Sequence, residues 1–243
     1  MTNWVAADWP APAGIRAGTT LRTGGASDGP YASLNLGDHV NDQPLFVTEN
    51  RRRLQHECEL PAPPQWLHQV HGSTVVALPN SFEHPEADAA ITTERGVVCA
   101  VLTADCLPVL FASKDGSAIG AAHAGWRGLL DGVLEATVDK LPAQSGILAW
   151  LGPAISQKAF EVGAEVRDAF VARSPEAAPF FERNARGRWQ ADLYGLARHR
   201  LAGIGITDVY GGNRCTYTES NAFFSYRRDG QCGRMASFVF RAE

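Results

Sequence analysis

The 243-residue sequence lacks any apolar run of the roughly 18–20 residues that a membrane-spanning helix needs. Its first ten residues, MTNWVAADWP, have neither the basic start nor the apolar core of a secretion signal. A basic excess is also missing, because 22 Lys and Arg face 26 Asp and Glu, for a net charge of −4. Duplex DNA and anionic membranes select for basic proteins, so we expect neither as a partner. We expect the protein to act in the cytoplasm.

Cysteine and histidine are both scarce. The five cysteines, at positions 58, 99, 106, 215 and 232, form no CxxC pair, and their number is odd. A disulfide framework is therefore not expected, and each cysteine is core filler, a reactive thiol or a metal ligand. The seven histidines include no His-x-His pair. Multicopper chemistry uses many histidine ligands, typically in such pairs, so the composition disfavours it.

The chain also has no internal repeat and no linker, since the Pro-rich stretch at 60–64 is too short to separate domains. We therefore expect one domain over 1–243. Apolar runs rich in β-branched residues predict buried strands, and a spacing of three and four residues over 128–141 predicts an amphipathic helix. The expected class is α/β (α+β), with mixed sheets layered with helices. Expected helices are 44–56, 128–141, 158–173 and 192–203; expected strands are 15–22, 31–36, 66–78, 97–102, 109–112, 118–123, 147–151, 208–210, 223–226 and 236–241.

Three short segments place metal-binding side chains at predicted strand ends, namely QVHG at 69–72, ADCLP at 104–108 and AHAGWRG at 122–128. Loops at strand ends expose side chains while the sheet holds them in place. Their candidate ligands are His71, Cys106 and His123. Two imidazoles and one thiolate form a known zinc-binding set that leaves a fourth position for water or substrate.

From spacing alone, other interpretations of these residues stay open. Cys106 could be core filler and the histidines could be structural. Cys106 could also be the nucleophile of a hydrolase, with His123 as base and Asp105 as orienting group. In a non-enzymatic binding module, zinc would be a structural staple with His68 as the fourth ligand.

The longer motifs resemble those of the YfiH family, long labelled laccase-like multicopper polyphenol oxidases and now described as purine nucleoside phosphorylases. The resemblance runs from RTGG at 22–25 to the C-terminus. One departure is His68, where the enterobacterial member has an acidic residue. The segments that carry the resemblance are 67–74, 103–111, 122–129, 151–155, 214–219, 223–229 and 233–238.

The resemblance implies a zinc site made of His71, Cys106 and His123, with copper as the less favoured metal. It implies phosphorolysis of adenosine, inosine and methylthioadenosine, with adenosine deamination as a further activity. A peptidoglycan editing role is also attached to the family. Hydrolysis of wrongly made muropeptide precursors through Cys106 and His123 is therefore an alternative, as is copper-dependent polyphenol oxidation.

Phosphorolysis needs an anion site, and several side chains near the motifs could supply it. We expect Arg22, Asn35, Arg127 and Arg227 to contact substrate or phosphate. Asp105 is the candidate catalytic carboxylate, because it could orient a histidine ligand or accept a proton. The expected partners are a small purine nucleoside and phosphate, and we expect a monomer. The other arginines considered are Arg214, Arg228 and Arg234.

Overall fold

Two sheets dominate the computed structural model, which describes residues 3–143 and 145–242. The larger sheet has six strands in the order β12-β8-β6-β7-β4-β3 and mixes parallel with antiparallel pairs. Its central strands are buried along their whole length, as their continuous apolar sequences predict. The strands are β3 (Val75–Ala77), β4 (Ala89–Thr92), β6 (Leu107–Ser113), β7 (Ile119–Ala124), β8 (Ile147–Leu151) and β12 (Val209–Gly211).

The second sheet is antiparallel and joins the two ends of the chain. Its order is β1-β2-β13-β5, so the C-terminal strand lies between two strands from the first half of the sequence. These strands are β1 (Trp4–Ala6), β2 (Ile15–Thr20), β5 (Val98–Thr103) and β13 (Met235–Arg241). A small third sheet is formed by β9 (Glu161–Val162), β10 (Phe181–Arg183) and β11 (Trp189–Ala191).

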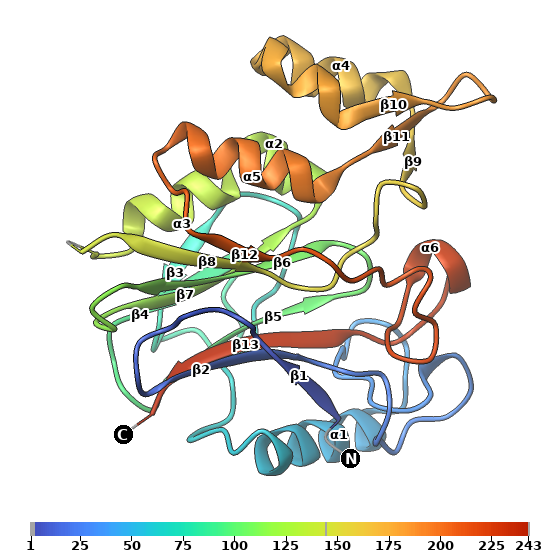
Figure 1. The fold of residues 1–243 in the computed structure, drawn as a ribbon. Helices are drawn as coiled ribbons and strands as arrows, with labels where there is room; N and C mark the ends of the chain where they lie inside the picture. Colours follow the sequence, from blue (N-terminus) through green and yellow to red (C-terminus); the bar gives the residue numbers. More distant parts are fainter. Residues whose placement is uncertain (1–2, 144, 243) are drawn as a thin grey trace.

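Four of the described helices cover the outer faces of the two large sheets (Figure 1). In Figure 1, α1 lies below the four-stranded sheet, while α2, α3 and α5 lie above the six-stranded sheet; α4 and the third sheet project at the upper right. The helices are α1 (Pro44–Glu57), α2 (Trp126–Asp131), α3 (Val133–Lys140), α4 (Ala164–Arg173), α5 (Leu193–Gly203) and α6 (Tyr226–Asp229), with 3₁₀ turns at Gly29–Tyr31 and Pro175–Phe180.

Alternating side chains on the central strands separate three apolar cores. On β6, Val109 and Phe111 pack in the core under the helices, whereas Leu110 and Ala112 pack between the two sheets. On β13, Phe238 instead belongs to the core that Leu54 of α1 covers. Because successive strand residues point to opposite faces, one sequence pattern supplies two layers of core at once. The expected mixed α+β class with layered sheets is confirmed.

Most predicted elements are present, but several boundaries differ. The predicted helix 128–141 is two helices, because Gly132 has φ 97° and interrupts the helical backbone. The predicted helix 158–173 begins only at Ala164, since residues before it form β9. No described helix is both long enough and apolar enough to cross a bilayer.

Three predicted strands were wrong in whole or in part. Residues 31–36 bond to the side-chain amide of Asn50, which donates to the carbonyl oxygens of Ser33 and Asn35, and form no strand. Of 66–78, only β3 is extended strand. Residues 223–226 lead instead into helix α6, where the Ser225 hydroxyl caps the helix by accepting from the Arg228 amide.

Candidate metal centre and its cavity

Three side chains from separate segments meet at one end of the six-stranded sheet. His71 lies in the loop before β3, Cys106 joins β5 to β6, and His123 lies on β7. The pairing of β6 with β7 places Leu107 opposite Ala124, so Cys106 lies beside the end of β7. One nitrogen or sulfur atom from each of His71, Cys106 and His123 lies within 4.8 Å of the others. The sequence thus brings all three predicted ligands together.

The two imidazoles and the thiol face one another. The His71 and His123 rings are edge to face, with centroids 4.8 Å apart at 77°. The Cys106 Sγ lies 3.9 Å from Nε2 of His71. His123 is buried, Cys106 is partly exposed and His71 is exposed, so one side of the cluster is open. An ion held here would keep a position accessible to a ligand.

A buried carboxylate, Asp88, fixes two of the three ligands. Its Oδ1 lies 2.8 Å from Nδ1 of His123, which leaves Nε2 of that ring for a metal. The backbone N–H groups of Val70, His71 and Gly72 also donate to this carboxylate, at 2.7–3.2 Å. Those three bonds hold His71 at φ 63°, a conformation that few residues other than glycine adopt. They also explain why residues 70–72 are not strand.

Two further contacts bring the ligand loops close together. The Gln69 side chain exchanges two hydrogen bonds with the backbone of Leu102, at 2.7 and 2.9 Å, and ties the His71 loop to β5. Gly125 follows β7, and a Cβ there would lie 3.1 Å from both the Cys106 sulfur and the His71 ring. The absence of a side chain at Gly125 therefore leaves room for the cluster.

The electrostatics of the cluster favour a thiolate. Burial opposes ionisation of Cys106, but the charge and hydrogen bonds of His123, with help from His71, lower the thiol pKa to about 6. Burial likewise opposes protonation of His123, but Cys106 and Asp88 raise its pKa to about 9. At pH 7 the pair is therefore a thiolate beside a protonated His123. A metal would replace the proton on Nε2 of His123, and one thiolate with two neutral imidazoles is a donor set that suits zinc. His68 does not join this set among the described residues, so it supplies no fourth ligand.

The open side of the cluster faces a cavity of about 370 Å³, which we call the metal cavity. Arg234 and His39 line it together with the three ligands, and Tyr226 adds an exposed aromatic ring. A 260 Å³ cavity containing Trp66, His68 and His84 shares His39, Gln69 and Leu102 with it, and a 140 Å³ cavity shares Ala104, Cys106 and Tyr226. The cluster therefore lies in the middle of a longer groove.

Three of the residues expected to bind substrate lie elsewhere. Arg22 donates to the carbonyls of Ala32 and Ser220 and lines a separate surface hollow. Asn35 is fully buried and its amide bonds only to protein groups. Arg127 stacks on Trp126 and is not among the described residues that line the metal cavity. We therefore do not assign these three side chains to substrate binding.

Arg227 and Asp105 lie close to the cluster but are engaged with each other. The Asp105 carboxylate accepts from the Thr216 hydroxyl at 2.6 Å and from the Arg227 backbone N–H at 2.7 Å. The Arg227 guanidinium donates to the Glu161 carbonyl and lies over Phe160. Asp105 thus anchors α6 beside Cys106, and the orienting carboxylate that we expected Asp105 to be is Asp88.

The roles of Asp88 and His39 and the place of Arg234 were not predicted from the sequence. One signal was available for Asp88, a carboxylate directly before the buried strand β4 within the apolar stretch at 87–92. A charged group in such a run needs several partners, and loop N–H groups and a histidine supply them here. His39 and Arg234 carry no such signal, because only the fold brings their loops to the metal cavity.

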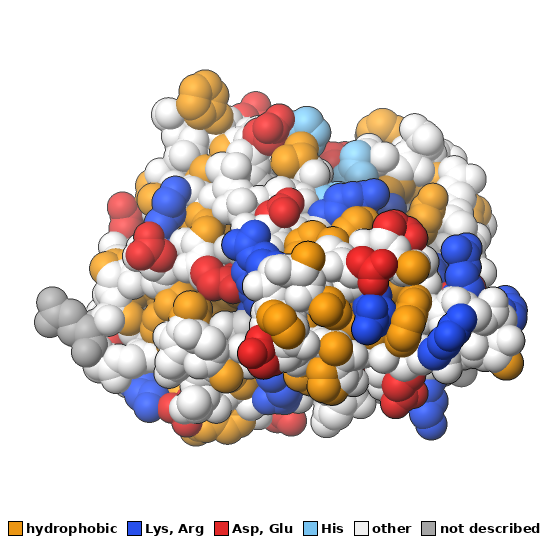
Figure 2. All heavy atoms as spheres, turned by 90° about the horizontal axis from the view of Figure 1, so that it is seen from above, with side chains coloured by type: hydrophobic (Ala, Val, Ile, Leu, Met, Phe, Trp, Pro, Cys, Tyr) orange, Lys and Arg blue, Asp and Glu red, His pale blue; other side chains and the backbone are white. Residues whose placement is uncertain are grey.

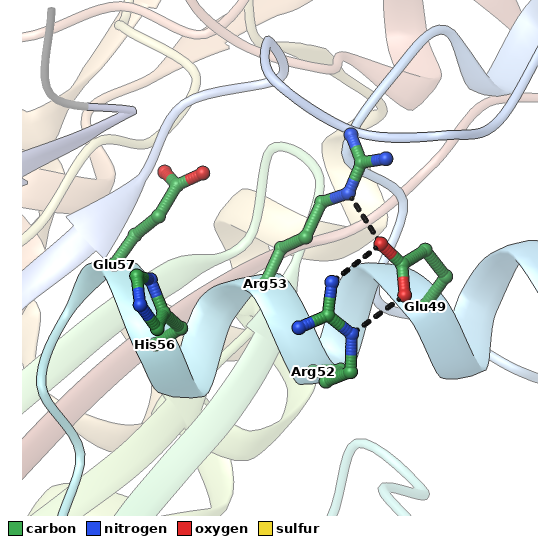
Figure 3. Close-up of a pocket in the computed structure, with 5 residues that line it drawn as sticks. All are labelled: Glu49, Arg52, Arg53, His56 and Glu57. Carbon is green, nitrogen blue, oxygen red and sulfur yellow. Dashed lines mark hydrogen bonds and ion pairs between the residues drawn. The ribbon is translucent and has the colours of Figure 1, made fainter.

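A further surface hollow, of about 390 Å³, lies along α1 (Figure 3). There Arg52 and Arg53 both point toward Glu49 and form ion pairs with it at 2.7–2.9 Å. His56 and Glu57 occupy the next turn of the helix. Solvated pairs of this kind, three and four residues apart, stabilise a helix surface modestly. We assign no ligand to this hollow.

Layered sheets whose loops carry a two-histidine, one-cysteine cluster open to a cavity define a protein with a candidate metal-dependent active site. The family model described as multi-copper polyphenol oxidoreductase laccase matches residues 16–242. The chain belongs to this family, also called the YfiH family.

Several named relatives match over nearly the whole chain. The purine nucleoside phosphorylase YfiH of Shigella flexneri is 51% identical, with 99% of each chain covered. A purine nucleoside phosphorylase of Pseudomonas aeruginosa is 53% identical with the same coverage. The crystal structure of a Neisseria meningitidis protein superposes with a TM-score of 0.94 at 48% identity, covering 99% of this chain and 100% of that one. The fold is thus that of solved family members.

Proposed function

We propose that the protein is a zinc-dependent purine nucleoside phosphorylase that also deaminates adenosine. The observation that carries this proposal is the convergence of His71, Cys106 and His123 on one cavity that also contains an arginine, Arg234. The names of the relatives support the phosphorylase activity. Phosphorolysis needs a cation that binds phosphate, and an open metal position can polarise a group of the substrate.

Zinc would be held by the thiolate and the two imidazoles, and when bound it would supply Lewis acidity to a polar group of the substrate. The chain itself orients these ligands. Asp88 holds the His123 ring and the His71 backbone, and Gln69 holds the same loop against β5. Because these partners are protein groups, the ligands are in place before substrate arrives.

The rest of the cavity fits a purine nucleoside and an anion. Tyr226 offers an exposed aromatic face to a planar base. Arg234 offers positive charge to the phosphate that would attack C1′ of adenosine, inosine or methylthioadenosine. In that reaction the C1′–N9 bond breaks with its electron pair going to the base, and a phosphate oxygen forms the new bond to C1′. The proposal includes a monomeric enzyme.

The deciding experiment follows adenosine, with and without phosphate, over protein of measured zinc content. Phosphate-dependent formation of adenine and ribose 1-phosphate, lost in Cys106→Ala, is the expected result. Inosine formed without phosphate would support the deaminase activity alone. Loss of neither activity in Cys106→Ala would refute a role for the cluster. Arg127→Ala is the matched control, because its side chain is exposed and outside the metal cavity.

A second candidate function is hydrolysis through a cysteine nucleophile, with a wrongly made muropeptide as substrate. The observation that favours it is the chain of contacts from Cys106 to His123 to Asp88, with the thiol pKa lowered and the imidazole pKa raised. A sulfur that binds zinc is not free to attack. Activity that survives zinc removal by a chelator, but not alkylation of Cys106, would support this candidate over the first.

A further inference from the structure

A histidine and an arginine side chain lie next to each other on the wall of the metal cavity. His39 and Arg234 both line it, from loops about 200 residues apart in sequence. Gly37 lies beneath them, and a Cβ there would be 2.8 Å from Cγ of Arg234 and 3.4 Å from Cε1 of His39. The missing side chain at Gly37 therefore allows the arginine stem and the imidazole to pack side by side. Figure 2 shows histidine and basic side chains grouped on the face seen from above.

The backbone that carries this pair is held by Asn35. Its side-chain Oδ1 accepts from the N–H of Gly37 at 3.0 Å and from the N–H of Arg234 at 2.9 Å. One buried amide thus joins the loop of His39 to the strand end of Arg234. The arrangement is built into the fold and does not depend on the conformations of exposed side chains.

The Arg234 guanidinium keeps donors available. Its Nη1 donates to the carbonyls of Cys232 and Gly233, at 2.9 and 3.1 Å, and its Cζ lies 5.9 Å from the centroid of the Tyr226 ring. Among the described residues, neither Nε nor Nη2 of Arg234 has a hydrogen-bond acceptor. A guanidinium fork with two such donors suits the oxygens of a tetrahedral anion.

The charge around His39 also favours an anion. Asp38 lies 3.5 Å from Nδ1 of His39, but Arg51 shares that carboxylate at 3.2 Å. Around His39, Arg51 and Arg234 outweigh Asp38, so the local charge is positive whether or not His39 is protonated. By contrast, Arg227 in the neighbouring cavity is already bonded to the Glu161 carbonyl.

We propose that His39 and Arg234 form a binding site for a tetrahedral oxyanion beside the candidate metal ligands, with Asn35 and Gly37 as positioning residues. We call it the oxyanion site. The inference rests on the proposed function, in which this anion is the phosphate co-substrate. An inorganic phosphate and the phosphate of a nucleoside monophosphate share the required chemistry. The experiment therefore compares inorganic phosphate with adenosine monophosphate.

The test is calorimetric titration of the zinc-loaded protein with each anion, before any turnover is measured. His39→Gln and Arg234→Lys should each weaken inorganic phosphate binding by about 10- to 100-fold, since each removes a charge-assisted or forked hydrogen bond. Arg127→Ala should bind as the parent protein does. Gly37→Ala, which keeps His39 and Arg234 but crowds them, should weaken binding in the same direction. If adenosine monophosphate binds more tightly than inorganic phosphate, and the same variants lose this tighter binding, the oxyanion site binds the phosphate of a nucleotide.

Turnover separates failure of this inference from failure of the proposed function. If phosphate binds and both His39→Gln and Arg234→Lys weaken that binding, the oxyanion site is supported even when no nucleoside is cleaved. If nucleosides are cleaved with phosphate but the variants leave the phosphate KM unchanged, the phosphorylase function is supported and the oxyanion site is refuted. Equal zinc content and equal circular dichroism spectra of all variants exclude misfolding as the cause.

Discussion

The Asp88 carboxylate lies 2.8 Å from Nδ1 of His123, and it also accepts the N–H of His71 at 2.9 Å. One buried acid therefore orients two candidate metal ligands from different segments. Groups that orient metal ligands in this way typically change metal affinity by about 10- to 100-fold when they are replaced.

We predict that Asp88→Asn lowers zinc affinity within that range. The neutral amide keeps an oxygen for one backbone N–H but loses the charge that favours the donating Nδ1 tautomer of His123. Competition with a chromogenic chelator measures the affinity. Asp139→Asn is the control, because Asp139 is an exposed carboxylate on α3. Unchanged zinc affinity in Asp88→Asn would show that Asp88 has only a structural role.

The cysteines should separate into ligand and core filler. Cys106→Ser should lose most bound zinc, because a hydroxyl is a much poorer ligand than a thiolate. Cys99→Ala, between the two sheets, should keep its zinc and lose only about 1 kcal/mol of unfolding free energy, from the small volume removed. Metal analysis and urea unfolding measure the two effects. Zinc retained in Cys106→Ser would remove this thiol from the ligand set.

The sequence predicted that His71, Cys106 and His123 meet, because they lie in motifs near strand ends. His71 precedes β3, Cys106 precedes β6 and His123 lies near the end of β7, and the sheet brings these ends together. The period of apolar residues likewise predicted the central strands, where burial alone decides the conformation.

The remaining errors have a common physical cause, which is a side chain that replaces backbone pairing. Asn50 bonds the backbone of residues 33 and 35, and Asp88 bonds that of residues 70–72, so neither segment is strand. Such contacts join residues far apart in sequence and leave no periodic signal. The same limit hid the proximity of His39 to Arg234, which exists only in the folded chain.

The family description mentions several coppers, and the geometry makes a prediction about that chemistry. Among residues 3–143 and 145–242, a single group of His, Cys, Asp and Glu has metal-binding spacing. We predict that protein loaded with copper oxidises phenols no faster than His71→Ala treated in the same way. Oxygen uptake with a phenol substrate measures this rate. A clear excess in the parent protein would favour the oxidase activity.

The break between α2 and α3 should depend on Gly132, whose φ is 97°. We predict that Gly132→Ala lowers the free energy of unfolding by about 1–2 kcal/mol, because a side chain disfavours this left-handed conformation. Gly203→Ala, in α5, should be neutral or raise stability by up to about 1 kcal/mol, since a Cβ there meets nothing within 4 Å. Urea unfolding compares the two. Equal effects would show that backbone conformation does not set the break.

Phosphate binding should be coupled to protonation of His39. Burial and the charge of Arg234 lower the pKa of His39 below its ordinary value of 6.5, while Asp38 opposes this and Arg51 adds to it. The imidazole is therefore neutral at pH 7 in the free protein. An anion bound at the oxyanion site favours the charged form of His39, so binding takes up a proton and raises the His39 pKa.

As pH falls from 7 toward 5, phosphate affinity should therefore rise more in the parent protein than in His39→Gln. The variant is the right comparison because phosphate itself and the metal ligands titrate in both proteins. Calorimetry in buffers of different ionisation enthalpy counts the protons taken up. Equal proton uptake by the two proteins would mean that His39 does not contact the anion.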